Sequence, residues 1–111
     1  MLDRKGILGA KDLETVTVAV PEWGGDVCMR GLTAGERDSF EASIGSSVNL
    51  VNLRARLVVL CLVDEDGERV FKDSDAQNLG KKSAQVVDRL FDRARSLSGM
   101  SDEDVQELEK N

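Results

Sequence analysis

Apolar and polar side chains alternate along residues 14–20, where valine occupies positions 16, 18 and 20. Because successive side chains of a β-strand point to opposite faces, this spacing predicts a strand with one valine-rich face. Pro21 cannot donate to a hydrogen-bonded ladder and should end the strand, and Gly24-Gly25 supplies the backbone freedom that a turn needs. A second strand is expected from Asp26 to Leu32. The sequence therefore predicts a β-hairpin over residues 14–32.

A capping-box pattern marks the start of the next element. Thr33 and Glu36 have the spacing at which the hydroxyl and the carboxylate each accept a hydrogen bond from the other residue's backbone N–H. The helix that follows places Phe40 and Ile44 four residues apart, and therefore on one face. Gly45 is expected to end this helix.

A second helix is predicted from about Val48 to Leu62. Its apolar residues form two stripes, one of Leu50, Leu53, Leu57 and Leu60 and the other of Val51, Ala55, Val58 and Leu62. Two apolar stripes leave little polar surface, so this helix should be the central, buried one. The run from Leu57 to Val63 is also compatible with a buried strand, which periodicity does not distinguish from a buried helix. The pattern upstream of Leu57 favours helix.

The C-terminal half of the chain contains two further helix signals. Asp64–Gly67 is typical of a turn, and Val70-Phe71 begins a short extended segment after it. Ser74 with Gln77 forms a possible cap before a short helix. Ser83 begins a longer helix, whose inner face would carry Val86, Val87, Leu90, Phe91, Ala94 and Leu97.

These elements indicate one domain that spans the 111 residues of the chain. Residues 1–13 are expected to form a weakly ordered leader, and residues 100–111 a marginal acidic tail. The predicted class is α+β, with an N-terminal β-hairpin packed on a bundle of about three to four helices. Aromatic residues make up only 4% of the chain, so leucine and valine must fill most of the core.

Cys28 and Cys61 are the two cysteines, and both lie in apolar runs. A small secreted domain that relied on disulfides would usually carry more cysteines than two. We expect both to be buried free thiols that pack as small hydrophobic side chains. A Cys28–Cys61 disulfide is the alternative.

The formal net charge of −6 argues against a nucleic-acid-binding protein, which needs Lys and Arg massed on one face. The longest apolar run extends only from Leu57 to Val63, whereas a membrane span needs about 20 apolar residues. The first eleven residues are broken by Asp3, Arg4 and Lys5, so they do not resemble a signal peptide. These features predict a cytoplasmic protein.

The chain has no histidine, and therefore lacks the usual general base and the commonest metal ligand. Asp64 and Asp66 suggest a calcium loop, but with Gly67 at the sixth position the first ligand would be Leu62, which cannot coordinate calcium. Gly6 and Gly9, which precede Lys11, are too closely spaced for a phosphate-binding loop. We therefore expect no catalytic site, no metal, no cofactor and no small-molecule substrate.

Trp23 is the residue whose position folding explains least. It is the single tryptophan of the chain and lies at the predicted tip of the hairpin. A large aromatic side chain there could fold back onto the sheet. It could instead be an anchor for a protein partner, because tryptophan is enriched at binding hot spots. Trp23 is the one candidate binding residue that the sequence offers.

The segments from Pro21 to Thr33 and from Val63 to Phe71, with their turns and helix cap, resemble the tail assembly chaperones of long-tailed bacteriophages. The resemblance extends from about Ile7 to the C-terminus. It implies a phage or prophage protein of the host cytoplasm that binds the tape measure protein, with the tail tube protein as a second partner, before the tube polymerises. It also implies that the protein self-associates and is absent from the finished virion. No catalytic residue is implied.

Two other functions fit the same sequence. A phage structural adaptor, such as a head–tail joining protein, would also be small and acidic, but it would remain in purified virions. An acidic DNA mimic would inhibit a nucleic-acid enzyme through a stripe of carboxylates. The chain has 15 basic and 21 acidic residues, and the basic residues would interrupt any such stripe.

Overall fold

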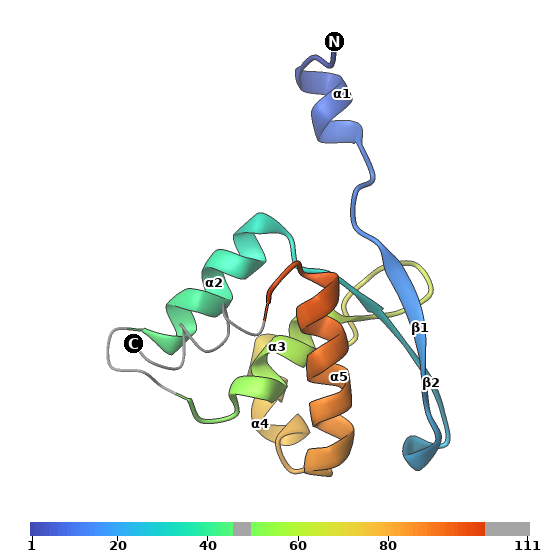
Figure 1. Ribbon diagram of the computed structural model, residues 1–111, viewed down its shortest axis with the longest axis vertical. Coiled ribbons are helices and arrows are strands. Elements are labelled where there is room, and N and C mark those ends of the chain that lie inside the picture. The colour runs from blue at the N-terminus through green and yellow to red at the C-terminus, as the bar shows by residue number, and fades with distance from the viewer. Residues whose placement is uncertain (46–49, 102–111) are drawn as a thin grey trace.

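The computed structural model describes residues 1–45 and 50–101. Within these ranges a three-stranded antiparallel sheet lies to one side of a group of helices (Figure 1). The strand order is β1 (Thr15–Val20), β2 (Gly25–Arg30) and β3 (Leu62–Val63). This arrangement confirms the predicted α+β class, with an N-terminal hairpin packed on a small helical bundle.

The hairpin consists of β1 (Thr15–Val20) and β2 (Gly25–Arg30), joined by a 3₁₀ turn, η1 (Pro21–Trp23). Gly24 closes the turn with a φ of +80°, a conformation that glycine adopts without steric cost. The register pairs Val16 with Met29 and therefore places the valines of β1 on the face that packs on the core. The expected hairpin is confirmed, although β2 begins and ends earlier than Asp26–Leu32.

The early end of β2 has a local cause at Gly31. A Cβ atom at this position would clash with the Leu97 carbonyl, so the chain passes too close to the last turn of α5 (Ala84–Leu97) for any larger residue. The Leu32 N–H then donates to Ser98 Oγ at 3.1 Å instead of continuing the ladder.

Helix α2 (Ala34–Ile44) begins with the predicted capping box. The Glu36 N–H donates to Thr33 Oγ1 at 3.1 Å, and the Thr33 N–H donates to Glu36 Oε1 at 2.9 Å. Phe40 and Ile44 are both buried, as their spacing predicted.

Helix α3 (Leu53–Cys61) is shorter than the predicted Val48–Leu62. It starts late because Asn52 adopts the left-handed conformation, with a φ of +55°, and leaves Leu50 and Val51 exposed before the helix. It ends early because Leu62 and Val63 leave the helix to form β3 (Leu62–Val63), which pairs with Met29 and Cys28 of β2. Val48 lies outside the described residues.

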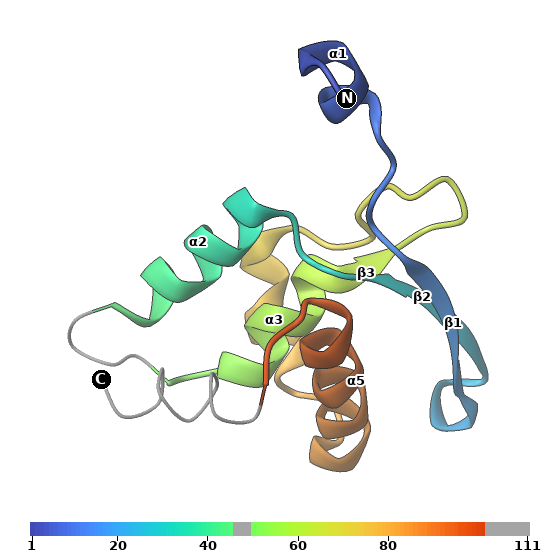
Figure 2. The same ribbon diagram turned by 45° about the horizontal axis from the view of Figure 1, so that its top comes forward.

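Helix α3 nevertheless lies at the centre of the protein, as expected for a helix with two apolar stripes. All its residues are buried except Arg54 and Arg56. Around it pack α2, α4 (Ala76–Leu79) and α5 (Figure 2). The predicted inner face of α5 is confirmed, with Leu97 partly buried and the other five residues buried, namely Val86, Val87, Leu90, Phe91 and Ala94.

The cap predicted at Ser74 and Gln77 is wrong. A 3₁₀ turn, η2 (Asp73–Asp75), precedes α4, and there the Lys72 N–H donates to the Asp75 carboxylate at 2.9 Å. Asp75 thus caps the N-terminus of η2, and among the described residues no side-chain hydrogen bond caps the start of α4. The expected extended segment at Val70-Phe71 is reduced to one bridge between Arg69 and Val63.

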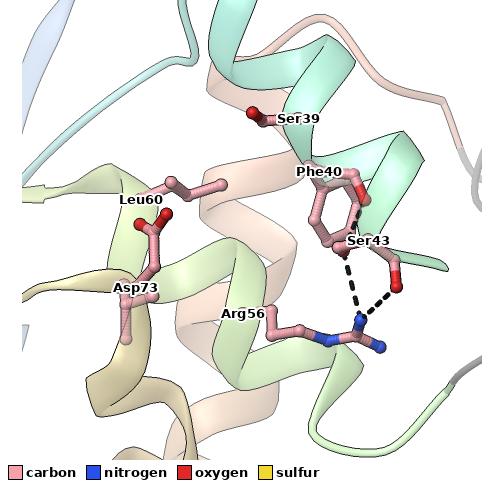
Figure 3. Close-up of a pocket in the computed structure, with 7 residues that line it drawn as sticks. Ser39, Phe40, Ser43, Arg56, Leu60 and Asp73 are labelled. Atoms are coloured by element: carbon pink, nitrogen blue, oxygen red, sulfur yellow. Dashed lines mark hydrogen bonds between the residues drawn. The ribbon is translucent and has the colours of Figure 1, made fainter.

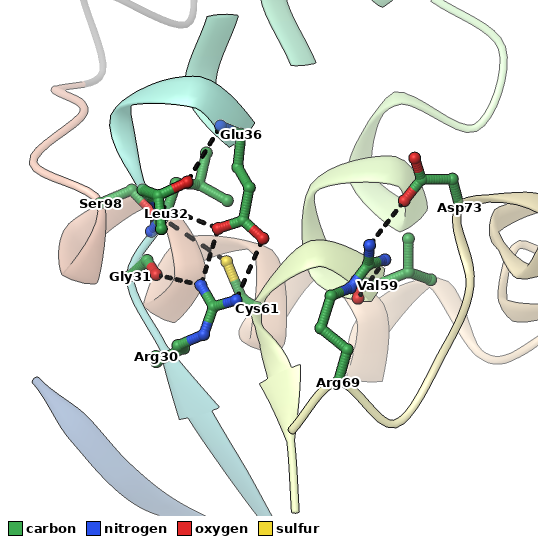
Figure 4. Close-up of polar contacts among 10 residues, drawn as sticks. Arg30, Gly31, Leu32, Glu36, Val59, Cys61, Arg69, Asp73 and Ser98 are labelled. Atoms are coloured by element: carbon green, nitrogen blue, oxygen red, sulfur yellow. Dashed lines mark hydrogen bonds and ion pairs between the residues drawn. The ribbon is translucent and has the colours of Figure 1, made fainter. Parts of the chain in front are cut away.

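Two arginines tie the sheet region to the helices (Figure 4). Arg30 donates twice to the Glu36 carboxylate, at 2.8 and 3.0 Å, and once to the Gly31 carbonyl at 2.8 Å. Arg69 donates to the Val59 carbonyl at 3.1 Å, near the C-terminal end of α3, and pairs with Asp73 at 2.8 Å. The second set fastens the segment after β3 to the central helix.

The expected leader contains a short helix, α1 (Arg4–Gly9). Both views show α1 apart from the rest of the molecule (Figures 1 and 2), and none of its residues is buried. The expected tail extends beyond the described residues from position 102 onward.

A candidate protein-binding groove

A groove of about 610 Å³ lies between β2 and the segment that follows β3. We call it the Trp23 groove; its lining residues are Trp23, Asp26, Val27, Cys28, Leu62, Val63, Asp64, Glu65, Asp66, Val70 and Phe71. It exists because β3 pairs with only two residues of β2, so the tip of the hairpin continues past the end of β3. Its volume is within the range of about 300–1,000 Å³ that is typical of binding pockets.

Trp23 lies at one end of this groove. Its exposed fraction is 37%, so it is neither a core residue nor fully free in solvent. Trp23 and Phe71 also line a second hollow, which shares no other residue with the groove and continues to Leu79 and Lys82. The partner-binding role of Trp23 stays a prediction, and the tryptophan has an accessible face beside an apolar surface.

The hairpin tip that carries Trp23 is held by its neighbour Glu22. Arg89 of α5 donates two hydrogen bonds to the Glu22 carboxylate, at 2.6 and 2.9 Å. These bonds lower the pKa of Glu22, because they favour its charged form. The position of Trp23 relative to the helices therefore depends on an ion pair between residues far apart in the sequence.

Acidic side chains surround the apolar part of the groove. Every charged side chain that lines it among the described residues is a carboxylate, namely Asp26, Asp64, Glu65 and Asp66. Asp64 also holds the turn, because its carboxylate accepts hydrogen bonds from the Asp66 and Glu68 N–H groups at 2.9 and 3.0 Å. All four carboxylates are exposed. An apolar floor with an acidic rim suits an apolar segment that carries Lys or Arg.

Val70 completes the apolar surface, with an exposed fraction of 56%. Sequence reasoning identified Trp23 but not Val70, Phe71 or the acidic rim as parts of one site. The turn at 64–67 was visible in the sequence. Its place in the lining of the same groove as Trp23 was not.

The two cysteines differ in environment, and both are free thiols. Cys61 is buried as predicted, and burial raises its pKa to about 11. A hydrogen bond with Ser98 Oγ, 4.0 Å from the sulfur, lowers the pKa by a smaller amount. Cys28 was also expected to be buried, but it is only half-buried. The reason is that its side chain lies on the sheet face opposite Met29 and lines the Trp23 groove.

A smaller hollow of about 90 Å³ lies where α2 meets α3 (Figure 3). Arg56 reaches across it and donates to the Ser43 carbonyl and hydroxyl oxygens at 3.0 and 3.1 Å. Burial lowers the pKa of Arg56. This arrangement joins two helices and leaves little space for a ligand, so we interpret it as structural.

Within the described parts of the chain, no three metal-ligating side chains come together. No helix in those parts has the length and apolar character that crossing a membrane requires.

Comparisons with known proteins bear on the family and the fold of the chain. A family model described as phage tail assembly chaperone matches residues 9–111. The solved structure of the bacteriophage HK97 tail assembly chaperone is similar, with a TM-score of 0.64 and 24% sequence identity over 88% of this chain and 95% of that one. At this identity the likeness shows a shared fold. No curated protein matches the sequence.

Proposed function

Because the chain belongs to the phage tail assembly chaperone family, we propose that it binds the tape measure protein of a long-tailed phage in the host cytoplasm. In this proposal it keeps the tape measure protein soluble until the tail tube polymerises, and it is absent from the finished virion. We further propose that the protein self-associates and that the tail tube protein is a second partner.

The Trp23 groove is the observation that supports this proposal. Trp23 and Val70 present apolar surface to solvent beside Phe71, and apolar patches with polar rims mark protein-interaction sites. The acidic rim selects the partner by charge. We therefore propose that the groove takes an apolar segment of the tape measure protein that carries Lys or Arg.

Co-expression with the tape measure protein tests the proposal. Wild-type chain should increase the soluble fraction of the tape measure protein and co-purify with it, whereas Trp23→Ala combined with Val70→Asp should do neither. Leu50→Ala is the matched control, because Leu50 is 43% exposed and lies outside the groove. The control should behave as wild type.

Two outcomes would contradict the proposal. If the groove variant is folded and still keeps the tape measure protein soluble, the groove is not the binding site. If the chain is found in purified virions at a fixed ratio to the tail proteins, it is a structural adaptor and not a chaperone that leaves.

A further inference from the structure

Residues 1–13, which we call the arm, carry unpartnered apolar surface. Ile7 and Leu8 are consecutive residues of α1 with exposed fractions of 57% and 68%, and Met1 and Leu2 before them are also exposed. The helix stands apart from the body of the molecule (Figure 1), so these side chains have no place in the core of their own chain. Exposed apolar clusters of this kind usually mark a surface that another molecule covers.

The arm also carries basic side chains close to its apolar ones. Within α1 the charged residues are Arg4 and Lys5; after the helix, Lys11 is followed by Asp12. Asp3, just before the helix, uses its carboxylate to accept a hydrogen bond from the Gly6 N–H at 2.9 Å. The helix therefore presents isoleucine and leucine together with two cations.

The Trp23 groove has the complementary character. Its apolar side chains are bordered by carboxylates, and Glu65 and Asp66 are exposed on the turn that closes one side. We propose that the arm of one copy of this chain docks in the Trp23 groove of a second copy. Ile7 and Leu8 would lie against Trp23, Val70 and Phe71, while Arg4 and Lys5 would face the acidic rim.

Such a contact joins two different surfaces, so a docked pair keeps one free groove on one copy and one free arm on the other. A heterologous contact of this kind builds open chains or closed rings, and the assembly grows with protein concentration. The inference rests on the proposed function in one respect, namely that the tape measure protein uses the same groove. The arm of a neighbour and the tape measure protein would then exclude each other.

Mixing two variants tests the docking directly, without the tape measure protein. Ile7→Asp/Leu8→Asp removes the arm contact, and Trp23→Ala/Val70→Asp removes the groove contact. Circular dichroism should show that both variants are folded. In sedimentation velocity the wild type should grow in mass with concentration, and each variant alone should remain a monomer. An equimolar mixture should form a dimer, because one chain supplies the arm and the other the groove.

Several results would overturn the proposal. One is a mixture that stays monomeric, because the free arm of one variant would then not bind the free groove of the other. Another is a wild type that remains a monomer at every concentration, or an arm variant that keeps the mass of the wild type. None of these results alters the solubility assay for the tape measure protein, so the inference and the proposed function can fail separately.

An engineered interchain disulfide tests where the arm lies in the groove. Cys28 lines the groove, so Leu8→Cys should form an interchain disulfide with Cys28 when copper phenanthroline and dissolved oxygen are added as oxidant. Ala42→Cys is the control, because Ala42 is exposed on α2 and outside the groove. Mass spectrometry should find several-fold more cross-link with Leu8→Cys than with the control. Equal cross-linking would place the arm elsewhere.

Discussion

Arg89 of α5 and Glu22 of the hairpin tip form a two-bond ion pair, with distances of 2.6 and 2.9 Å. The guanidinium and carboxylate planes match in this geometry, so the pair sets direction as well as distance. Both side chains are nearly half exposed, which limits what the pair contributes to stability. Its consequence is local: it holds the turn that carries Trp23.

Arg89→Ala should therefore leave the melting temperature almost unchanged and weaken binding of the tape measure protein several-fold, because the hairpin tip loses its attachment to α5. Arg93→Ala is the control, since Arg93 is exposed on the same helix. Isothermal titration with a tape measure fragment would measure the effect. Equal affinities for the two variants would mean that the tip needs no anchor.

Leu57→Ala should destabilise the protein by about 2–5 kcal/mol, because Leu57 is fully buried in α3 and its loss leaves a cavity. Leu50→Ala should cost less than about 0.5 kcal/mol, because Leu50 precedes the helix and is exposed. Urea unfolding of both variants measures the difference. Similar losses would show that Leu50 belongs to the core.

Glu36 predicts a dependence of stability on pH. The hydrogen bonds from Arg30 hold the pKa of this carboxyl below its usual 4.5, so unfolding raises the pKa and lets the unfolded state bind more protons. The stabilisation is complete at pH values above the pKa that Glu36 has in the unfolded protein. It is lost as the pH falls through the lower pKa that Glu36 has in the folded protein. Glu36→Gln should cost about 1–2 kcal/mol at neutral pH, a figure reduced for partial exposure.

The comparison of wild type with Glu36→Gln should be made in urea at neutral pH and again well below pH 4.5. The difference in unfolding free energy should shrink at the acidic pH. A difference that is the same at both values would show that the ionised carboxylate does not contribute, and that packing explains the effect of the substitution.

The two thiols should react at very different rates with iodoacetamide. The thiolate is the reactive form, and burial keeps Cys61 protonated at neutral pH, with its pKa raised to about 11. Cys28 is half-buried in the groove and should react first. Peptide mapping after brief alkylation would show this order. Rapid labelling of Cys61 in the folded protein would contradict its burial.

Local patterns in the sequence predicted much of the fold. The alternation of valines defined β1, the spacing of Thr33 and Glu36 defined the start of α2, and the apolar periodicity after Ser83 defined α5. These features depend on neighbours within a few residues, which is why a single sequence reveals them. The limits of α3 were missed because Asn52 and Leu62 take their conformations from packing and strand pairing.

By itself, the sequence determined which side chains are apolar, where turns and caps interrupt them, and that Trp23 lies at a hairpin tip. It did not determine the groove, because Trp23 and Phe71 come together only through tertiary structure. The short pairing of β3 with β2 leaves the tip of the hairpin without a neighbouring strand, and the ion pair between Arg89 and Glu22 holds that tip in place. Contacts between distant segments depend on how the whole chain packs, and a local sequence pattern does not contain that information.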